Sequence, residues 1–157
     1  MGTETSRSTR IAIPPPVILG VPLGLGILLQ WWLPLRFPVT RWEGVAFGAF
    51  LGIPAIALIV TAHMAFRRAH TTLLPSGKVR ILITSGPFRL TRNPLYLGLV
   101  LLYAGIALVF RMGWPLIFIP GVIAGLHGFA ILPEERRLEM QFGDEYLAYR
   151  NRVRRWL

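Results

Sequence analysis

The chain has 157 residues and a formal net charge of +10, yet only 15 % of its residues are charged and 54 % are hydrophobic. A soluble domain of this size carries nearer a quarter charged residues, so the excess apolar side chains must face something other than water. The arginines and lysines border long apolar runs and form no separate basic region, which argues against nucleic-acid binding. The lack of cysteine excludes disulfides, thiolate metal sites and a cysteine nucleophile.

Four apolar segments follow one another along the chain, and each approaches the roughly 20 residues that cross the hydrocarbon core of a bilayer. They cover residues 17–35, 45–66, 95–110 and 114–132, and none contains a charged side chain. Because backbone groups in lipid must be hydrogen-bonded within the protein, these segments are expected to be helices. The sequence therefore predicts a single all-α, polytopic membrane domain over residues 1–157, with four transmembrane helices.

Basic residues are divided unevenly between the two ends of these predicted helices. Fourteen of the seventeen precede the first segment, join the second to the third, or follow the fourth; the other three are Arg36, Arg41 and Arg111. By the positive-inside rule, both termini are expected in the cytoplasm, and a bacterial or archaeal inner membrane is the expected location. Four tryptophans lie near the opposite end, as in an interfacial aromatic belt, at positions Trp31, Trp32, Trp42 and Trp114.

Residues 133–157 form a charged segment with one regularly spaced apolar stripe. The stripe residues are three or four positions apart, which is one face of a helix: Leu138, Phe142, Tyr146, Tyr149, Val153 and Trp156. We expect a cytoplasmic amphipathic helical tail that lies against the bundle and is divided into two helices at Gly143.

The predicted spans themselves offer little chemistry. A coupled transporter usually needs an ionisable group at membrane depth, and only His63 and His127 qualify. For either histidine, hydrogen-bonded packing is the favoured interpretation over a functional role. The small-residue stripe Gly44, Gly48 and Gly52 favours close packing inside the protein over dimerisation. No metal-ligand spacing is present, so no metal site is expected.

The first polar cluster surrounds the predicted start of the third span. Asn93 and Pro94 are typical of an N-cap and a first helical residue. Arg89, Arg92 and Tyr96 lie around the same helix start, and a helix N-terminus flanked by arginines can bind a carboxylate or phosphate.

The second polar cluster directly follows the fourth predicted span. Pro133, Glu134 and Glu135 allow two interpretations. The carboxylates could complement the dipole of a new helix start, or they could bind a cationic or polyhydroxyl ligand. The basic loop and the acidic pair together could hold a zwitterion.

Both clusters resemble signatures of one enzyme family. Residues 85–98, SGPFRLTRNPLYLG, are similar to the G-P-[YF]-R-x-x-R-[HN]-P-x-Y-x-G signature of isoprenylcysteine carboxyl methyltransferases and phospholipid methyltransferases. Residues 133–149, PEERRLEMQFGDEYLAY, resemble its E-E-x-x-L-x-x-x-F-G-x-x-Y-x-x-Y signature. The resemblance covers about residues 75–157. Asn93 stands where the isoprenylcysteine enzymes usually have histidine, which argues against prenylated-protein substrates.

The resemblance implies a membrane methyltransferase that uses S-adenosylmethionine on a lipophilic small molecule or lipid taken from the surrounding membrane. It implies that the two signatures build a cytoplasmic cofactor pocket. The expected cofactor-binding residues are Arg89, Asn93, Pro94, Tyr96, Gly98, Glu134, Glu135 and Tyr146. The expected catalytic residues are Arg92, Glu135 and His127, the last two as bases for an amine acceptor. The alternatives are a sterol-reductase-like enzyme that uses NADPH and a non-catalytic transporter or assembly protein.

Overall fold

The computed structural model describes residues 13–69 and 81–157, and this part of the chain is helical and contains no strand. The α-helices are α1 (Pro15–Trp32), α2 (Arg41–Arg68), α3 (Pro94–Val109), α4 (Gly113–Leu126), α5 (Leu132–Phe142) and α6 (Asp144–Arg152). Two short segments of other helix types are the 3₁₀ turn η1 (Gly86–Arg89) and the π-helical turn η2 (His127–Ile131). The predicted all-α class is confirmed.

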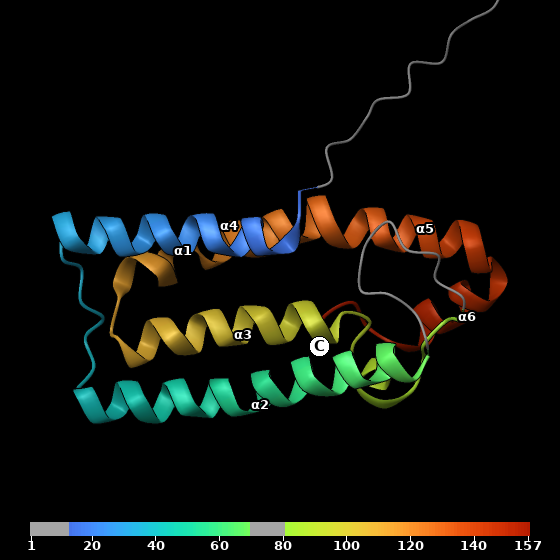
Figure 1. Ribbon diagram of the computed structural model, residues 1–157, viewed down its shortest axis with the longest axis horizontal. Helices are drawn as coiled ribbons and strands as arrows, with labels where there is room; N and C mark the ends of the chain where they lie inside the picture. Colours follow the sequence, from blue (N-terminus) through green and yellow to red (C-terminus); the bar gives the residue numbers. More distant parts are fainter. Residues whose placement is uncertain (1–12, 70–80) are drawn as a thin grey trace, which may run out of the picture.

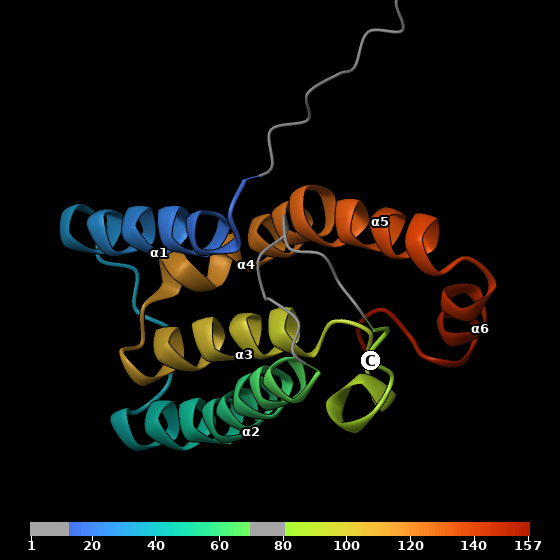
Figure 2. The ribbon, with the colours of Figure 1, turned by 45° about the vertical axis from the view of Figure 1, so that its right-hand side comes forward.

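Helices α1 to α4 run side by side as an elongated bundle (Figure 1). Helix α2 packs along α3, and α1 packs along α4. The connections 33–40 and 110–112 lie at one end of the bundle, whereas η1, α5 and α6 gather at the other (Figure 2). The two signature segments identified in the sequence therefore meet at one end of the molecule, which we call the polar end.

Three helices are long and apolar enough to cross a membrane: α1, α2 and the continuous helix Gly113–Phe142. Large apolar side chains on α2 remain exposed, with Phe50 at 74 % and Ile53 at 70 % of full exposure. Contiguous exposed apolar surface of this kind is expected against lipid and not against water. The chain is thus an integral membrane protein. Helix α3, which covers the predicted third span, has only 16 residues, so helix length alone does not establish four spans.

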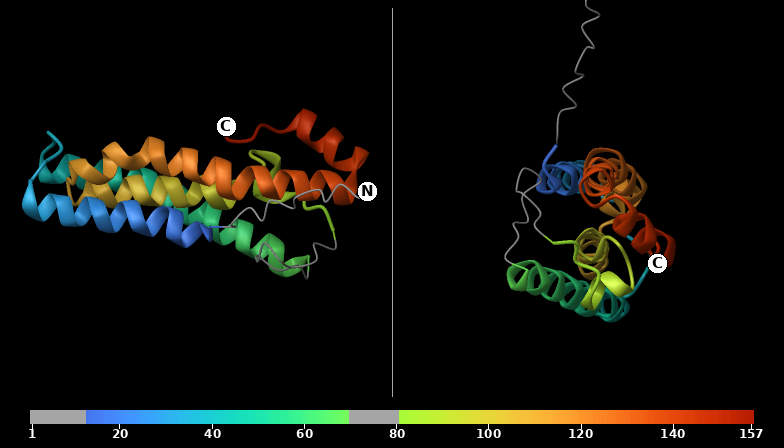
Figure 3. Two further views of the ribbon diagram at one scale, coloured as in Figure 1. Left: turned by 90° about the horizontal axis from the view of Figure 1, so that it is seen from above. Right: turned by 90° about the vertical axis from the view of Figure 1, so that its right-hand side faces the viewer.

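No new helix starts at Pro133, between the fourth apolar segment and the tail. Ile131 keeps helical backbone angles, with φ −69° and ψ −51°, and the helix runs unbroken from α4 through η2 into α5 (Figure 3). The π turn explains how Pro133 is accommodated. Pro133 has no N–H and its ring would crowd the carbonyl four residues earlier, but here Leu132 N–H already bonds five residues back, to His127 O. Glu134 and Glu135 consequently do not lie at a free helix start.

Glycines set the close approach of α2 and α3. A methyl group added to Gly48 would lie 2.7 Å from a carbonyl oxygen of α3, and one added to Gly98 would lie 2.9 Å from a carbonyl oxygen of α2. Gly44 also faces α3, whereas Gly52 has open space around it. Gly44 and Gly48 therefore pack helices within the protein, as predicted.

The opposite end of the bundle is held by backbone hydrogen bonds between its two connections. Phe37 N–H donates to Arg111 O at 3.0 Å, and Gly113 N–H donates to Leu35 O at 2.7 Å. Trp31, Trp32 and Trp42 are more than four-fifths exposed there. Among the basic residues counted for orientation, some lie outside the described residues: Arg7, Arg10, Lys78 and Arg80.

Candidate functional site

The polar end is held together by the C-terminal strap, which we define as residues 153–157. The Thr91 hydroxyl and the Asn93 side-chain amide both donate to Arg155 O, each at 3.0 Å. Thr91 is fully buried and Asn93 is 7 % exposed. Asn93 occupies the predicted N-cap position of α3, but its side chain makes no cap hydrogen bond because it is bonded to the strap.

A carboxylate with two arginines lies beneath this strap. Glu135 lies 3.2 Å from an Arg92 guanidinium nitrogen, and Arg155 donates to both Glu135 oxygens at 2.9 and 2.7 Å. The Glu135 and Arg92 side chains are only 11 % and 10 % exposed. The bidentate hydrogen bond to Glu135 raises the pKa of Arg155. Both oxygens of Glu135 are thus engaged by arginines, which favours a role in holding the pocket together.

Glu134, the neighbouring carboxylate, has different surroundings. The Tyr96 hydroxyl donates to Glu134 Oε2 at 3.0 Å, and within the described ranges Glu134 makes no ion pair. Its carboxyl group is therefore free to bind a ligand. Tyr96 is buried in the bundle core, so it holds this carboxylate on a rigid support.

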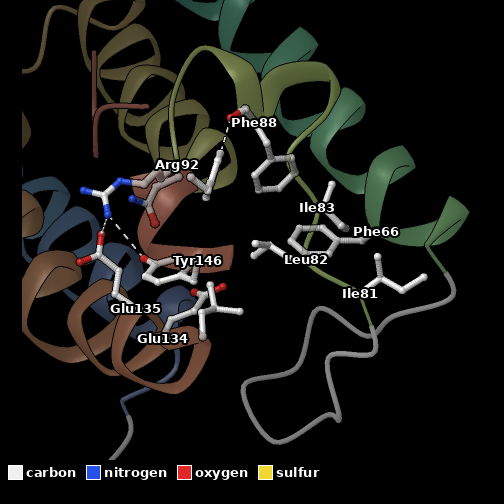
Figure 4. A pocket seen from close by; sticks show the side chains of 12 residues that line it. Phe66, Ile81, Leu82, Ile83, Phe88, Arg92, Glu134, Glu135 and Tyr146 are labelled. Atoms are coloured by element: carbon white, nitrogen blue, oxygen red, sulfur yellow. Dashed lines mark hydrogen bonds and ion pairs between the residues drawn. The ribbon is translucent and has the colours of Figure 1, made fainter. Parts of the chain in front are cut away.

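The pocket between these groups has one polar and one apolar wall (Figure 4). It is lined by Phe66, Ile81, Leu82, Ile83, Phe88, Arg92, Asn93, Glu134, Glu135, Leu138, Tyr146 and Tyr149. Its free volume is about 50 Å³, far below the roughly 300–1,000 Å³ of small-molecule sites. A large ligand must therefore displace part of the wall. The apolar side chains can shift without breaking side-chain hydrogen bonds, so the opening is expected on their side.

Helix α6 is tied to the η1 part of the apolar wall. Tyr149 donates its hydroxyl to Phe88 O at 2.7 Å, which ties α6 to η1 across the pocket. Tyr146 is 1 % exposed and lies beside Arg92, whose guanidinium is 3.5 Å from the Tyr146 hydroxyl. Burial raises the pKa of both phenols, so both remain protonated at neutral pH. The stripe predicted from the sequence packs here, through Leu138, Phe142, Tyr146, Tyr149 and Val153.

The structure brings most of the predicted site residues together. The pocket is lined by Arg92, Asn93, Glu134, Glu135 and Tyr146, and Tyr96 joins it through its hydrogen bond to Glu134. Other predicted residues do not line it: Arg89, Pro94, Gly98 and His127.

The four predicted site residues that do not line the pocket lie elsewhere in the fold. Arg89 is exposed at the end of η1, and Pro94 is buried at the first position of α3. Gly98 faces α2, and His127 begins the π turn. Their roles in ligand binding and catalysis therefore stay predictions.

Arg155 and the apolar wall were not predicted from the sequence. Arg155 lies beyond the last helix, where no periodicity indicates which way a side chain points. The sequence offered only an indirect indication of Arg155: Glu135 adjoins the end of a predicted span, and a carboxylate that is buried there requires a cation as partner. Ile81, Leu82 and Ile83 were read only as part of a connection between spans, although three successive apolar residues are unusual in a basic loop.

Comparison with known proteins identifies the family. The model of the phospholipid methyltransferase family (PEMT) matches residues 44–145, which is more than half of the chain and contains Arg92, Glu134 and Glu135. No curated protein and no solved structure matches the chain. Within the described residues, no group of three or more His, Asp or Glu side chains could hold a metal ion. The chain belongs to the phospholipid methyltransferase family.

Proposed function

We propose that the protein is a membrane-embedded methyltransferase that uses S-adenosylmethionine to methylate a lipophilic acceptor. The observation that carries this proposal is the meeting of Arg92 and Glu134 in one pocket at the polar end, inside the range that matches the family. Arg92 Nε is buried and has no hydrogen-bond partner among the described residues. Glu134, which makes no ion pair among the described residues, lines the same pocket.

These two groups fit the amino-acid end of S-adenosylmethionine. Its carboxylate matches the free Arg92 donor, and its ammonium matches Glu134, because charge-assisted hydrogen bonds are the strongest that a protein offers. Phe66 and Phe88, which contact each other edge to face at 5.5 Å, offer an aromatic surface for the adenine ring. When bound, the cofactor supplies an electrophilic methyl group on a sulfonium, whose leaving group is neutral.

The side chains of the pocket then act mainly by positioning. Holding two reactants in line and excluding water can supply roughly 7 to 11 kcal/mol of the barrier reduction at best. An amine acceptor must also lose a proton. Glu135 is held by two arginines and Glu134 is assigned to the cofactor's ammonium, so neither is assigned as the base. The match to the phospholipid methyltransferase family favours a phospholipid amine over an isoprenylcysteine carboxylate as the acceptor.

The proposed topology places the pocket where the cofactor is available. In the sequence, fourteen of the seventeen basic residues fall on one side of the predicted spans, and we assign this side, with the polar end and both termini, to the cytoplasm. We propose that α3 also crosses the membrane, which brings the number of spans to four. With 16 residues it is about 24 Å long, so the bilayer must thin locally around it.

Isothermal titration of the detergent-purified protein with S-adenosylhomocysteine and, separately, with NADPH tests the proposal. We expect binding of S-adenosylhomocysteine and none of NADPH. Binding of NADPH alone would instead support the reductase alternative. Binding of neither compound would support a non-catalytic membrane protein.

A further inference from the structure

A second cavity lies on the other side of the apolar wall, between the C-terminal half of α2 and residues 81–90. It measures about 1080 Å³, at the upper end of small-molecule sites. Most of its lining is apolar, including Pro54, Ala57, Leu58, Met64 and Leu90. Its polar lining residues include Arg68 and the hydroxyls of Thr84 and Ser85.

The groove follows α2 through the depth of one membrane leaflet. Its lining begins at Pro54 and ends at Ala69, a rise of about 22 Å at 1.5 Å per residue. One leaflet contributes roughly 15 Å of hydrocarbon and a headgroup layer beyond it. The groove therefore extends from the bilayer interior to its surface. Arg68, an exposed cation at the end of α2, lies where a lipid phosphate would be.

A single segment separates the groove from the polar pocket. Ile81, Leu82 and Ile83 line both cavities, so a ligand in the groove lies one chain thickness from the side of the pocket formed by Phe66 and Phe88. This is the same apolar wall that must move before the pocket can hold a large ligand. Figure 4 shows these three residues beside Phe66, facing Glu134 and Tyr146 across the pocket.

We propose that this groove binds one acyl chain of the phospholipid acceptor, and that residues 81–83 form the partition that its headgroup must cross. The inference rests on the proposed function. A chain leaving the bilayer for the groove gains little hydrophobic energy, because lipid is as apolar as the groove wall. The groove therefore serves orientation: it holds the chain along α2 with the phosphate at Arg68 and directs the headgroup toward the pocket.

Photocrosslinking tests the groove directly. The protein is placed in lipid nanodiscs that contain a trace of phosphatidylethanolamine with a mid-chain diazirine. We expect labelling at Met64 and Leu58 that excess unlabelled phosphatidylethanolamine competes away. Ala57→Phe should reduce this labelling by about tenfold, since overfilling a site generally weakens it. Ala46→Phe, a matched change on an exposed part of the same helix, should leave it unchanged.

Titration of the same variants with S-adenosylhomocysteine separates this inference from the proposed function. Ala57→Phe should bind S-adenosylhomocysteine as the unmodified protein does, and this also shows that the variant is folded. The groove assignment is overturned if unlabelled lipid fails to compete, or if Ala57→Phe and Ala46→Phe label alike. Competed labelling in a protein that binds no S-adenosylhomocysteine would support the groove while refuting the cofactor.

Discussion

Replacing each acidic residue of the pocket by glutamine separates a structural from a ligand-binding carboxylate. Glu135→Gln removes the only negative charge that Arg92 contacts among the described residues, and the Arg92 side chain is 10 % exposed. Breaking a buried ion pair typically costs 3–5 kcal/mol. Because Arg155 is 32 % exposed and can turn to water, and glutamine keeps one acceptor oxygen, we expect about 2–3 kcal/mol. The thermal midpoint should fall by about 5 °C or more.

Glu134→Gln should weaken ligand binding and leave the stability of the fold nearly unchanged. Glutamine can still accept the Tyr96 hydrogen bond, so the thermal midpoint without ligand should change little. A lost charge-assisted hydrogen bond costs roughly 1.5–3 kcal/mol, so affinity for S-adenosylhomocysteine should fall by about tenfold or more.

Glu139→Gln is the control for both variants. Glu139 pairs with Arg150 at 3.1 Å on the exposed surface, where such pairs contribute little. Its thermal midpoint should equal that of the unmodified protein, and its affinity for S-adenosylhomocysteine should stay within about twofold. If all three variants bind S-adenosylhomocysteine equally well, the ligand site lies elsewhere. If Glu135→Gln melts at the same temperature as the control, the ion pairs with Arg92 and Arg155 do not stabilise the fold.

Three further outcomes are expected. Gly48→Ala should destabilise the purified protein by about 1–3 kcal/mol, because its methyl group would meet a carbonyl of α3, whereas Gly52→Ala, with open space around it, should not; equal thermal midpoints would contradict the helix packing. Tyr149→Phe should cost about 1–2 kcal/mol near pH 8 by leaving Phe88 O unbonded. The folded-state pKa of Tyr149 is raised, so the stability difference between the two proteins is fully present below pH 10. It should shrink above pH 10, where the tyrosine of the unfolded chain ionises. A difference in thermal midpoint that stays constant up to pH 11 would refute the hydrogen bond from Tyr149 to Phe88 O. A reporter active only in the cytoplasm should be active when fused to Leu157, and a stable but inactive fusion would overturn the topology.

The helices could be predicted to within a few residues because lipid leaves the backbone no alternative to internal hydrogen bonds. The start of α2 differs most from the predicted start. Helix α2 begins at Arg41, four residues before the predicted span, because Thr40 and Glu43 form a reciprocal capping box. That signature is readable in the sequence and lies outside the apolar run, so hydropathy alone misses it.

The site was predictable where residues share a helix face and less so elsewhere. Asn93 and Tyr96 are three positions apart and point to the same side of α3. Gly98 is two positions beyond Tyr96, about 200° around the helix, and therefore faces α2. Arg155 follows the end of α6, and only the three-dimensional fold shows that it reaches Glu135.

The strap also has a consequence for the order of folding. Its hydrogen bonds to Thr91 and Asn93 join residues 64 and 62 positions apart, whereas helices form from bonds between near neighbours. Because residues 153–157 follow all the helices, the helices can be inserted and paired before the strap bonds to Thr91 and Asn93 and completes the pocket. Such a molecule would have nearly the full helical circular dichroism and no binding site. The fraction of active protein in a preparation must therefore be counted by ligand titration, since helix content will overstate it.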